Sequence, residues 1–306
     1  MIKQHHFNKN FAWYEVTDLS LAERKILHDQ HNISDELIYY ATDPNESARM
    51  EYDYDHNLTL MIFDVVTPDS NLEATEPVGI LFTNNALFVF VRPATQFTNQ
   101  TLLAPNNHQL LPTHTSLTPI DIILNGLYSL NSDYVTAIIG INRRRRELTD
   151  ELRASKSFKK QTNDLLQLET SLVYYLNSLR SNKFLLQDLQ RRSANVFTNL
   201  QLEHLEDVLV EVTQAIDMAE LAQEVTDSLS HSYANLVNDN LNQTMKLLTV
   251  YSILLTVPTI ISGFYGENVA LPFMNAKYGW QLTILFTLIG MLIVTYLLWR
   301  AGFFKK

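Results

Sequence analysis

Hydrophobic and polar positions follow two different spacings along this chain of 306 residues. Over roughly the first hundred residues, short apolar and β-branched runs alternate with polar turns, which is typical of strands. The clearest runs are residues 58–66 (LTLMIFDVV) and 78–91 (VGILFTNNALFVFV), and Asn84-Asn85 inside the second predicts a hairpin turn. A helix is expected at residues 21–30, after a Thr-Asp-Leu-Ser start. This segment is therefore predicted to mix short helices and strands.

Beyond the strand-rich segment the pattern becomes helical, and proline and glycine become rare. One stretch, NRRRRELTDELRAS, has the composition of a nucleic-acid-binding patch. On a helix, however, Arg143 would face Glu147 and Arg146 would face Asp150 at i,i+4 spacing. A solvated helix face is the favoured interpretation. The formal net charge of −10 also argues against nucleic acid as a partner and suits the attraction of cations.

A very long helical run follows, and its charges are all of one sign. Between Ser193 and Met245 there is no lysine or arginine, and no proline or glycine breaks the pattern. An uninterrupted helix of this length needs a coiled coil, a repeat or a membrane continuation. Its acids repel one another unless cations lie nearby. They are Glu203, Glu206, Asp207, Glu211, Asp217, Glu220, Glu224, Asp227 and Asp239.

Two uncharged stretches near the end of the chain are long enough to cross a bilayer. Residues 247–266 (LLTVYSILLTVPTIISGFYG) would extend ~30 Å as a helix at ~1.5 Å per residue. Residues 278–299 have a similar length, with Trp280 and Trp299 at their two ends as interface anchors. The alternative is a pair of buried core helices. The presence of two such runs so close together disfavours it. The flanking cations predict cytoplasmic chain ends and an outer loop at 267–278; these cations are Lys246, Arg300, Lys305 and Lys306.

Composition excludes several kinds of chemistry. The chain has no cysteine, which excludes disulfides, thiolate metal sites and cysteine nucleophiles. His5, His6 and His204 lack partners at catalytic or metal-ligand spacing, so an enzyme is not expected. The first residues contain no apolar segment of the kind that forms a secretory signal.

Small and hydroxyl-bearing residues form a stripe along the first of these spans. Thr249, Ser252, Thr256, Thr259 and Gly263 alternate steps of three and four, which places them on one helical face. Close helix packing through small residues is one explanation. A water-lined pore, formed by several copies around an axis, is the other. The pore is favoured because the same face continues before the span as asparagine and methionine, where packing needs no such extension.

The order of these parts resembles the CorA family of magnesium transporters. NDNLNQTMKLLT leads into the first span, GFYGEN leaves it, and a short loop, a second span and a basic tail follow. The likeness extends over the whole chain, since DELIYYATDPNESARMEYDYDHNLTLMIFDV and VGILFTNNALFVFV are similar to segments of the family's cytoplasmic domain. Where the family has Gly-Met-Asn after the first span, this chain has Gly266-Glu267-Asn268.

The resemblance implies an α+β cytoplasmic domain, a long helical stalk that continues into a two-helix transmembrane region, and a homopentamer in the lipid bilayer. The expected boundaries are 1–192 for the cytoplasmic funnel domain, 193–246 for the stalk helix and 247–306 for the membrane domain. The first span would line the pore, and the second would form an outer ring. The expected location is a bacterial inner membrane, with both termini in the cytoplasm.

The family's site residues carry over by position. Gly266 and Asn268 match its entrance motif, where a ring of asparagines binds a hydrated divalent cation, and Glu267 is the departure from that motif. Met245 and Leu248 match its apolar constriction, which acts as a gate. Asn242 matches a polar ring of the pore, and Thr259 and Gly263 match positions that face it. Asp207 matches the stalk aspartate of an inter-subunit regulatory magnesium site, and the partner of that aspartate in the N-terminal domain has no assigned position here.

Mg²⁺ is the expected ion, moved into the cytoplasm and also bound at the regulatory site. Two other functions remain open. A relative with altered entrance residues transports zinc, so Zn²⁺ and Co²⁺ stay candidates, although no histidine or cysteine cluster favours tight zinc coordination. The second of these other functions is that of a non-conducting, membrane-anchored oligomer whose acidic stalk senses cations. For Glu267, the alternative to a position at the pore is an outward one, toward Lys277 or water.

Overall fold

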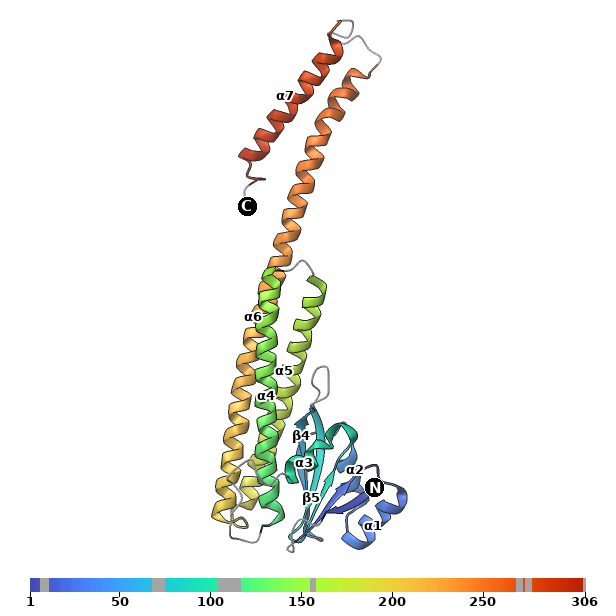
Figure 1. The fold of residues 1–306 in the computed structure, drawn as a ribbon, viewed down its shortest axis with the longest axis vertical. Helices are drawn as coiled ribbons and strands as arrows, with labels where there is room; N and C mark the ends of the chain where they lie inside the picture. The colour runs from blue at the N-terminus through green and yellow to red at the C-terminus, as the bar shows by residue number, and fades with distance from the viewer. Residues whose placement is uncertain are drawn as a thin grey trace. The chain divides into compact units, whose positions relative to one another are not determined.

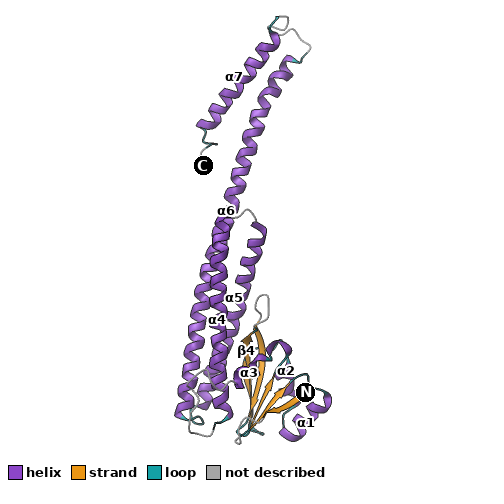
Figure 2. Ribbon diagram, viewed as in Figure 1, coloured by secondary structure: helices purple, strands orange, loops and turns teal. Residues whose placement is uncertain are grey.

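The computed structural model describes residues 1–5, 11–67, 75–103, 117–154, 158–267, 272 and 277–304. The chain forms two compact units, Met1–Ser230 and His231–Lys306. The first unit holds the described strands, helices α1 to α5 and the first part of α6. The second unit holds the rest of α6 and α7 (Figures 1 and 2).

Six strands form one mixed sheet in the order β1-β2-β6-β5-β4-β3. β2 and β6 run parallel, and the other neighbouring pairs are antiparallel. The strand expected at 58–66 is β4, and the expected hairpin is formed by β5 and β6, so both predictions are confirmed. In its turn the Thr83 hydroxyl accepts from the backbone N–H groups of Asn85 and Ala86, at 3.1 and 3.0 Å. The strands are β1 (Ile2–His5), β2 (Ala12–Val16), β3 (Arg49–Asp53), β4 (Leu58–Val66), β5 (Thr75–Phe82) and β6 (Ala86–Phe90).

Helices α1 (Leu21–His31) and α2 (Asp35–Thr42) cover one face of the sheet (Figure 1). Leu60 of β4 belongs to the apolar cluster beneath them. Its neighbour Met61 is also fully buried. Successive side chains of a strand point to opposite faces. β4 is therefore buried on both sides, which is why its sequence is a nearly continuous apolar run.

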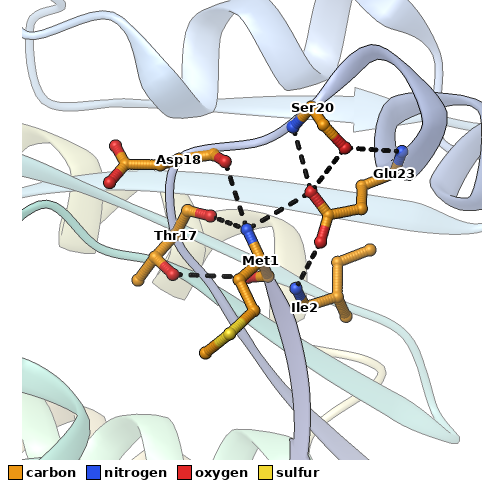
Figure 3. Close-up of polar contacts among 6 residues, drawn as sticks. All are labelled: Met1, Ile2, Thr17, Asp18, Ser20 and Glu23. Atoms are coloured by element: carbon orange, nitrogen blue, oxygen red, sulfur yellow. Dashed lines mark hydrogen bonds and ion pairs between the residues drawn. The ribbon is translucent and has the colours of Figure 1, made fainter.

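Glu23 joins the start of α1 to the first strand (Figure 3). Its carboxylate accepts hydrogen bonds from the Ser20 backbone N–H (3.0 Å), the Ser20 hydroxyl (2.7 Å) and the Ile2 backbone N–H (3.2 Å). The Ser20 hydroxyl accepts in turn from the Glu23 N–H, which completes a capping box. The two bonds from Ser20, with that of its backbone first, and then the N-terminal ammonium group favour the ionised carboxylate and lower the pKa of Glu23 to about 2. The helix therefore starts where the sequence predicts it.

Helices α4 (Pro119–Ala154) and α5 (Phe158–Ser193) pack on the other face of the sheet. Asn182 of α5 binds both backbone polar groups of Asp64: its Oδ1 accepts from the N–H (3.0 Å), and its Nδ2 donates to the carbonyl (2.9 Å). The Tyr134 hydroxyl of α4 donates to the same carbonyl at 3.1 Å. Strand β3 does not reach this far along β4. Side chains from two helices therefore make the backbone hydrogen bonds at Asp64 that a neighbouring strand would otherwise make.

The buried carboxyl group of Asp64 makes the stability of this unit depend on pH. Asp64 is 8% exposed, and burial, followed by the charge of Glu76, raises its pKa from 3.8 to about 6. Because the folded protein holds this proton more tightly than the unfolded chain, the carboxyl group stabilises the folded state fully when pH is below its pKa in the unfolded chain. This stabilisation is lost as pH rises through its pKa in the folded state. We expect it to cost roughly 3 kcal/mol between about pH 4 and pH 7.

Asp64→Asn should remove most of that pH dependence, because an amide carries no charge at either end of the range. Thermal unfolding at about pH 4.5 and about pH 7.5 measures the change, and the variant should gain stability over the parent at the higher pH. Asp227→Asn, at an exposed position of α6, is the matched control. Identical pH dependence in the parent and Asp64→Asn would contradict the assignment.

α6 (Asn199–Tyr265) is a single helix of 67 residues, and Pro258 lies inside it. α7 (Gly279–Arg300) follows. Each contains a stretch that is long and apolar enough to cross a membrane, with mean hydropathy of 1.8 and 2.2. The acidic run and the first span therefore belong to one helix, as expected, whereas the domain boundaries at 192 and 246 stay predictions. The short helices η1 (Pro93–Thr95) and α3 (Phe97–Leu103) precede α4.

The ion pairs expected within the four-arginine stretch are wrong. Arg144, rather than Arg143, binds Glu147 at 3.1 Å, and it also binds Asp164 of α5 at 2.7 Å. In the described part of the chain, no ion pair joins Arg146 to Asp150. The spacing rule considers one helix alone, so it could not include a carboxylate supplied by the neighbouring helix.

Candidate functional site

The face of α6 that was expected to line a pore is exposed in the single chain. Met245 and Leu248, the expected constriction, are 54% and 58% exposed. A Cβ atom added at Gly263 would meet no neighbouring atom within 4 Å. The other exposed positions of this face are Asn242, Thr249, Ser252, Thr256 and Thr259. The described part of the chain leaves this face uncovered.

Helix α7 packs on a different side of α6, away from the hydroxyl stripe. A Cβ at Gly290 of α7 would lie 3.0 Å from Cγ1 of Val257 and 3.7 Å from Cδ1 of Ile261. Val250, on the same side of α6, is only 6% exposed. At ~100° per residue, these three α6 residues lie about 140° from the middle of the hydroxyl stripe. One face of the span is thus covered by the second span, and no described residue covers the polar face.

The threonine hydroxyls of the stripe have a defined orientation. Thr249, Thr256 and Thr259 donate to backbone carbonyls four residues earlier, at 2.8, 2.8 and 3.0 Å. With its hydrogen used in this way, each hydroxyl retains its oxygen lone pairs as acceptors. The water molecules around a divalent cation are donors. An uncovered row of acceptors therefore suits contact with a hydrated cation.

The expected entrance lies at the end of α6. The backbone N–H of Gly266 donates to the Ser262 carbonyl at 2.9 Å, so the helical hydrogen bonds continue to this point. Glu267 is exposed, and among the described residues no ion pair joins it to Lys277. Asn268 lies outside the described residues. Whether Glu267 faces a pore stays a prediction.

Asp207 lies on the exposed side of α6 within the first unit. Its charge acts on Tyr128 of α4, whose hydroxyl donates to Glu211 at 3.1 Å. Burial first, and then Glu211 and Asp207, raise the pKa of Tyr128. In the described ranges, no group of three or more His, Cys, Asp and Glu side chains is arranged to hold a metal. The Asp207 site stays a prediction, and it requires a residue from another subunit.

Few of the acids of α6 form ion pairs with described residues. Glu220 forms an ion pair with Arg180 at 2.6 Å. For the rest of the acidic run, the described structure contains no ion pair; its exposed members are Glu203, Glu206, Asp207, Asp217, Glu224, Asp227 and Asp239. The resulting negative field along the helix attracts cations.

Gly290 is a residue that the sequence analysis missed. It allows α7 to approach α6, and any side chain there would press on Val257. The available signal was a lone glycine inside an apolar helix, which commonly marks a close helix–helix contact in membranes.

Comparisons with known proteins agree with this arrangement. The family model described as "CorA-like Mg2+ transporter protein" matches residues 8–301. The cobalt/magnesium transport protein CorA of Methanocaldococcus jannaschii is 26% identical over 95% of this chain and 90% of its own length. The CorA protein of Thermotoga maritima is 22% identical over 82% of this chain and 72% of its own.

A solved structure of similar fold is the complete CorA magnesium transporter of M. jannaschii, with a TM-score of 0.80 and 24% identity. The match covers 96% of this chain and 92% of that one, so the α/β domain, the long helix and the two terminal helices all have counterparts. Because the family model spans nearly the whole sequence, the chain belongs to the CorA-like Mg²⁺ transporter family and is a membrane transporter of divalent cations.

Proposed function

We propose that this chain moves Mg²⁺ into the cytoplasm through a homopentameric pore. The observation that carries the proposal is the polar face of α6, which no described residue covers and which points away from α7 on a membrane-length helix. Hydroxyl and amide groups facing lipid would lose their hydrogen bonds to water. Several copies around an axis place these groups on a shared water-filled path, with the α7 helices outside. The names of the curated relatives, which mention cobalt and magnesium, support the choice of ion.

The cation keeps its hydration shell along this path. Mg²⁺ loses water reluctantly, so oxygen acceptors that contact its bound water can select it without removing that shell. The Asn268 amides at the mouth and the Thr259 and Thr256 hydroxyls within the span supply such acceptors. Rings of Leu248 and Met245 interrupt the polar path and form the gate. An inside-negative potential drives a doubly charged ion inward by about 4.6 kcal/mol per 100 mV.

The membrane orientation follows from the charges that flank the spans. Arg300 directly follows the second span and Lys246 directly precedes the first. Cationic residues stay on the cytoplasmic side of membranes. We therefore place both termini in the cytoplasm of a bacterial cell, with the connection between α6 and α7 outside the inner membrane.

Flux into proteoliposomes tests this function directly. The purified full-length protein should admit Mg²⁺ into vesicles that hold a magnesium-sensitive dye, faster when the interior is made negative. Protein-free vesicles and vesicles with Asn268→Ala serve as controls. A tether that senses cations would move no ion under any condition, and that result would overturn the proposal. Parallel measurements with Co²⁺, Ni²⁺ and Zn²⁺ rank the ions and test the zinc alternative.

Asp207 is proposed to regulate the pore by binding a cytoplasmic cation between subunits. Such an ion would stabilise the closed state, and its release would shift the population toward the open one. The uncompensated acids of α6 favour this role, because a cation there relieves their repulsion.

Asp207→Ala should weaken the protection from proteolysis that millimolar Mg²⁺ gives, and should raise flux at high internal Mg²⁺. The expected shift in the half-protecting Mg²⁺ concentration is about tenfold, the loss of one charged ligand. Asp217→Ala, at another exposed acid of the same helix, is the matched control. Superimposed protection curves for Asp207→Ala and the parent would mean that Asp207 is an ordinary solvated acid.

A further inference from the structure

A groove between α4 and α6 in the first unit is lined by three arginine side chains. The two helices run parallel here, as the contacts of Gln201 with Asp121 (2.9 Å) and of Glu211 with Tyr128 (3.1 Å) show. Further along both helices the groove has a volume of about 410 Å³. Its lining residues are Ile139, Asn142, Arg143, Arg145, Arg146, Leu221 and Val225.

Among the described residues, no acidic side chain forms an ion pair with the three arginines that line this groove. Arg144 forms ion pairs with Glu147 of α4 and with Asp164 of α5. For Arg143, Arg145 and Arg146, by contrast, the described part of the chain supplies no ion pair. The Nε–H of Arg145 is buried, and the described residues offer it no hydrogen-bond acceptor.

That unmet donor is energetically unfavourable as the chain stands. A buried donor without an acceptor loses its hydrogen bond to water and gains nothing in return. Burial, and then the charge of Arg146, lower the pKa of Arg145, so the surroundings disfavour its cation. A negative charge in the groove, which Arg145 lines, would favour its cation and offset the repulsion from Arg146.

The floor of the groove is apolar rather than acidic. Ile139 is 49% exposed, Leu221 is 62% exposed and Val225 is 39% exposed, although all three are large aliphatic side chains. Glu224 stands between the last two on α6, yet it forms no ion pair with these arginines among the described residues. The groove therefore combines three cations, the side-chain amide of Asn142 and an uncovered apolar surface.

We propose that this groove binds a phosphate-bearing anion that carries an apolar body. Guanidinium groups match phosphate oxygens with paired hydrogen bonds, and several arginines in one turn suit an anion with more than one negative charge. The aliphatic floor provides contact area for an attached ring or chain. A volume of about 410 Å³ lies within the usual range of small-molecule sites. A nucleoside diphosphate and the headgroup of an anionic phospholipid both have this chemistry.

The first test uses the full-length protein, purified in detergent and stripped of bound lipid, with ADP, pyrophosphate and adenosine as probes in isothermal titration calorimetry. ADP should bind with one site per chain, pyrophosphate should bind more weakly, and adenosine should not bind measurably. Arg145→Gln should weaken ADP by about 10- to 100-fold, as expected for one charged hydrogen-bonding group. Arg180→Gln removes an exposed arginine that pairs with Glu220 and should leave ADP binding unchanged.

A second arm distinguishes the two sources of phosphate. The same proteins are placed in nanodiscs of phosphatidylglycerol or of phosphatidylcholine, and retained lipid is counted by native mass spectrometry after release. Phosphatidylglycerol that stays bound to the parent and to Arg180→Gln, but not to Arg145→Gln, would support the proposal with a lipid as the occupant. ADP binding in the first arm would support it with a soluble occupant.

Variants of the floor keep the proposal open to refutation if Arg145→Gln folds poorly. Leu221→Ser should bring the affinity for ADP down toward that for pyrophosphate, while pyrophosphate itself is unaffected. If the parent neither binds ADP nor retains phospholipid, the proposal is overturned. So would binding that Arg145→Gln and Leu221→Ser both leave intact, or a cross-link that shows the groove filled by acids of a second copy of this chain.

Discussion

Serine in place of Leu248 is expected to make the closed pore leak, raising resting Mg²⁺ flux by about tenfold or more. A ring of leucines closes a narrow pore because water leaves an apolar constriction, and an ion cannot cross without its water. A hydroxyl at each of these positions holds water and removes that barrier. Met245→Ser should act in the same direction, since both side chains lie on the uncovered face of α6 and are more than half exposed in the single chain.

Leu247 supplies a matched control for this experiment. It is also a leucine, directly precedes Leu248 and is 57% exposed. At ~100° per residue, however, it points to nearly the opposite side of α6 from the hydroxyl stripe. Leu247→Ser should therefore leave resting flux unchanged in the same proteoliposomes. If both gate variants conduct like the parent, the constriction lies elsewhere and the assigned register of α6 is wrong.

The elements that the sequence predicts well are those whose cause is local. Strand β4 is buried on both faces, so its apolar run matches its bounds residue for residue. The start of α1 is set by Ser20 and Glu23, three positions apart. The two spans are recognisable because length and absence of charge are sufficient signals. In each case the physical determinant lies within a short window of sequence.

Features that depend on distant residues were not predictable in this way. Asn182 and Tyr134 bind the backbone of Asp64 across long sequence separations, and no spacing rule connects them. Arg144 takes a carboxylate from α5, which overturns the ion pairs expected along α4. The groove lined by Arg145 exists only because α4 and α6 lie side by side.

The candidate ion pathway falls between these two cases. The periodicity of Thr249, Ser252 and Thr256 places them on one face of a helix, but it cannot say what that face meets. The position of Gly290 against Val257 resolves part of this question, because it assigns the second span to the other side of α6. A partner for Asp207 would come from a neighbouring subunit, so neither the helical periodicity nor the contacts within one chain identify it.

Asn268→Ala is expected to abolish selective Mg²⁺ transport, with a loss of flux of at least roughly tenfold, whereas Glu267→Met should preserve transport. The two residues are adjacent, yet their contributions differ in kind. The amide oxygens of Asn268 would accept from the water shell of the cation and select it by short-range geometry. The carboxylates of Glu267 would act at longer range, since a ring of acids concentrates cations at a pore mouth.

The salt dependence of transport separates these two roles. Charges are screened over ~30 Å at 0.01 M ionic strength but over ~8 Å at 0.15 M. Glu267→Met should therefore raise the half-saturating Mg²⁺ concentration by about three- to tenfold at low ionic strength, and much less at physiological salt. Glu267→Gln, which keeps the shape and removes the charge, should behave like Glu267→Met, and Lys277→Met should not. A concentration dependence that Glu267→Met leaves unchanged at low salt would place the carboxylate away from the entrance, as a tolerated replacement for methionine in the GFYGEN segment.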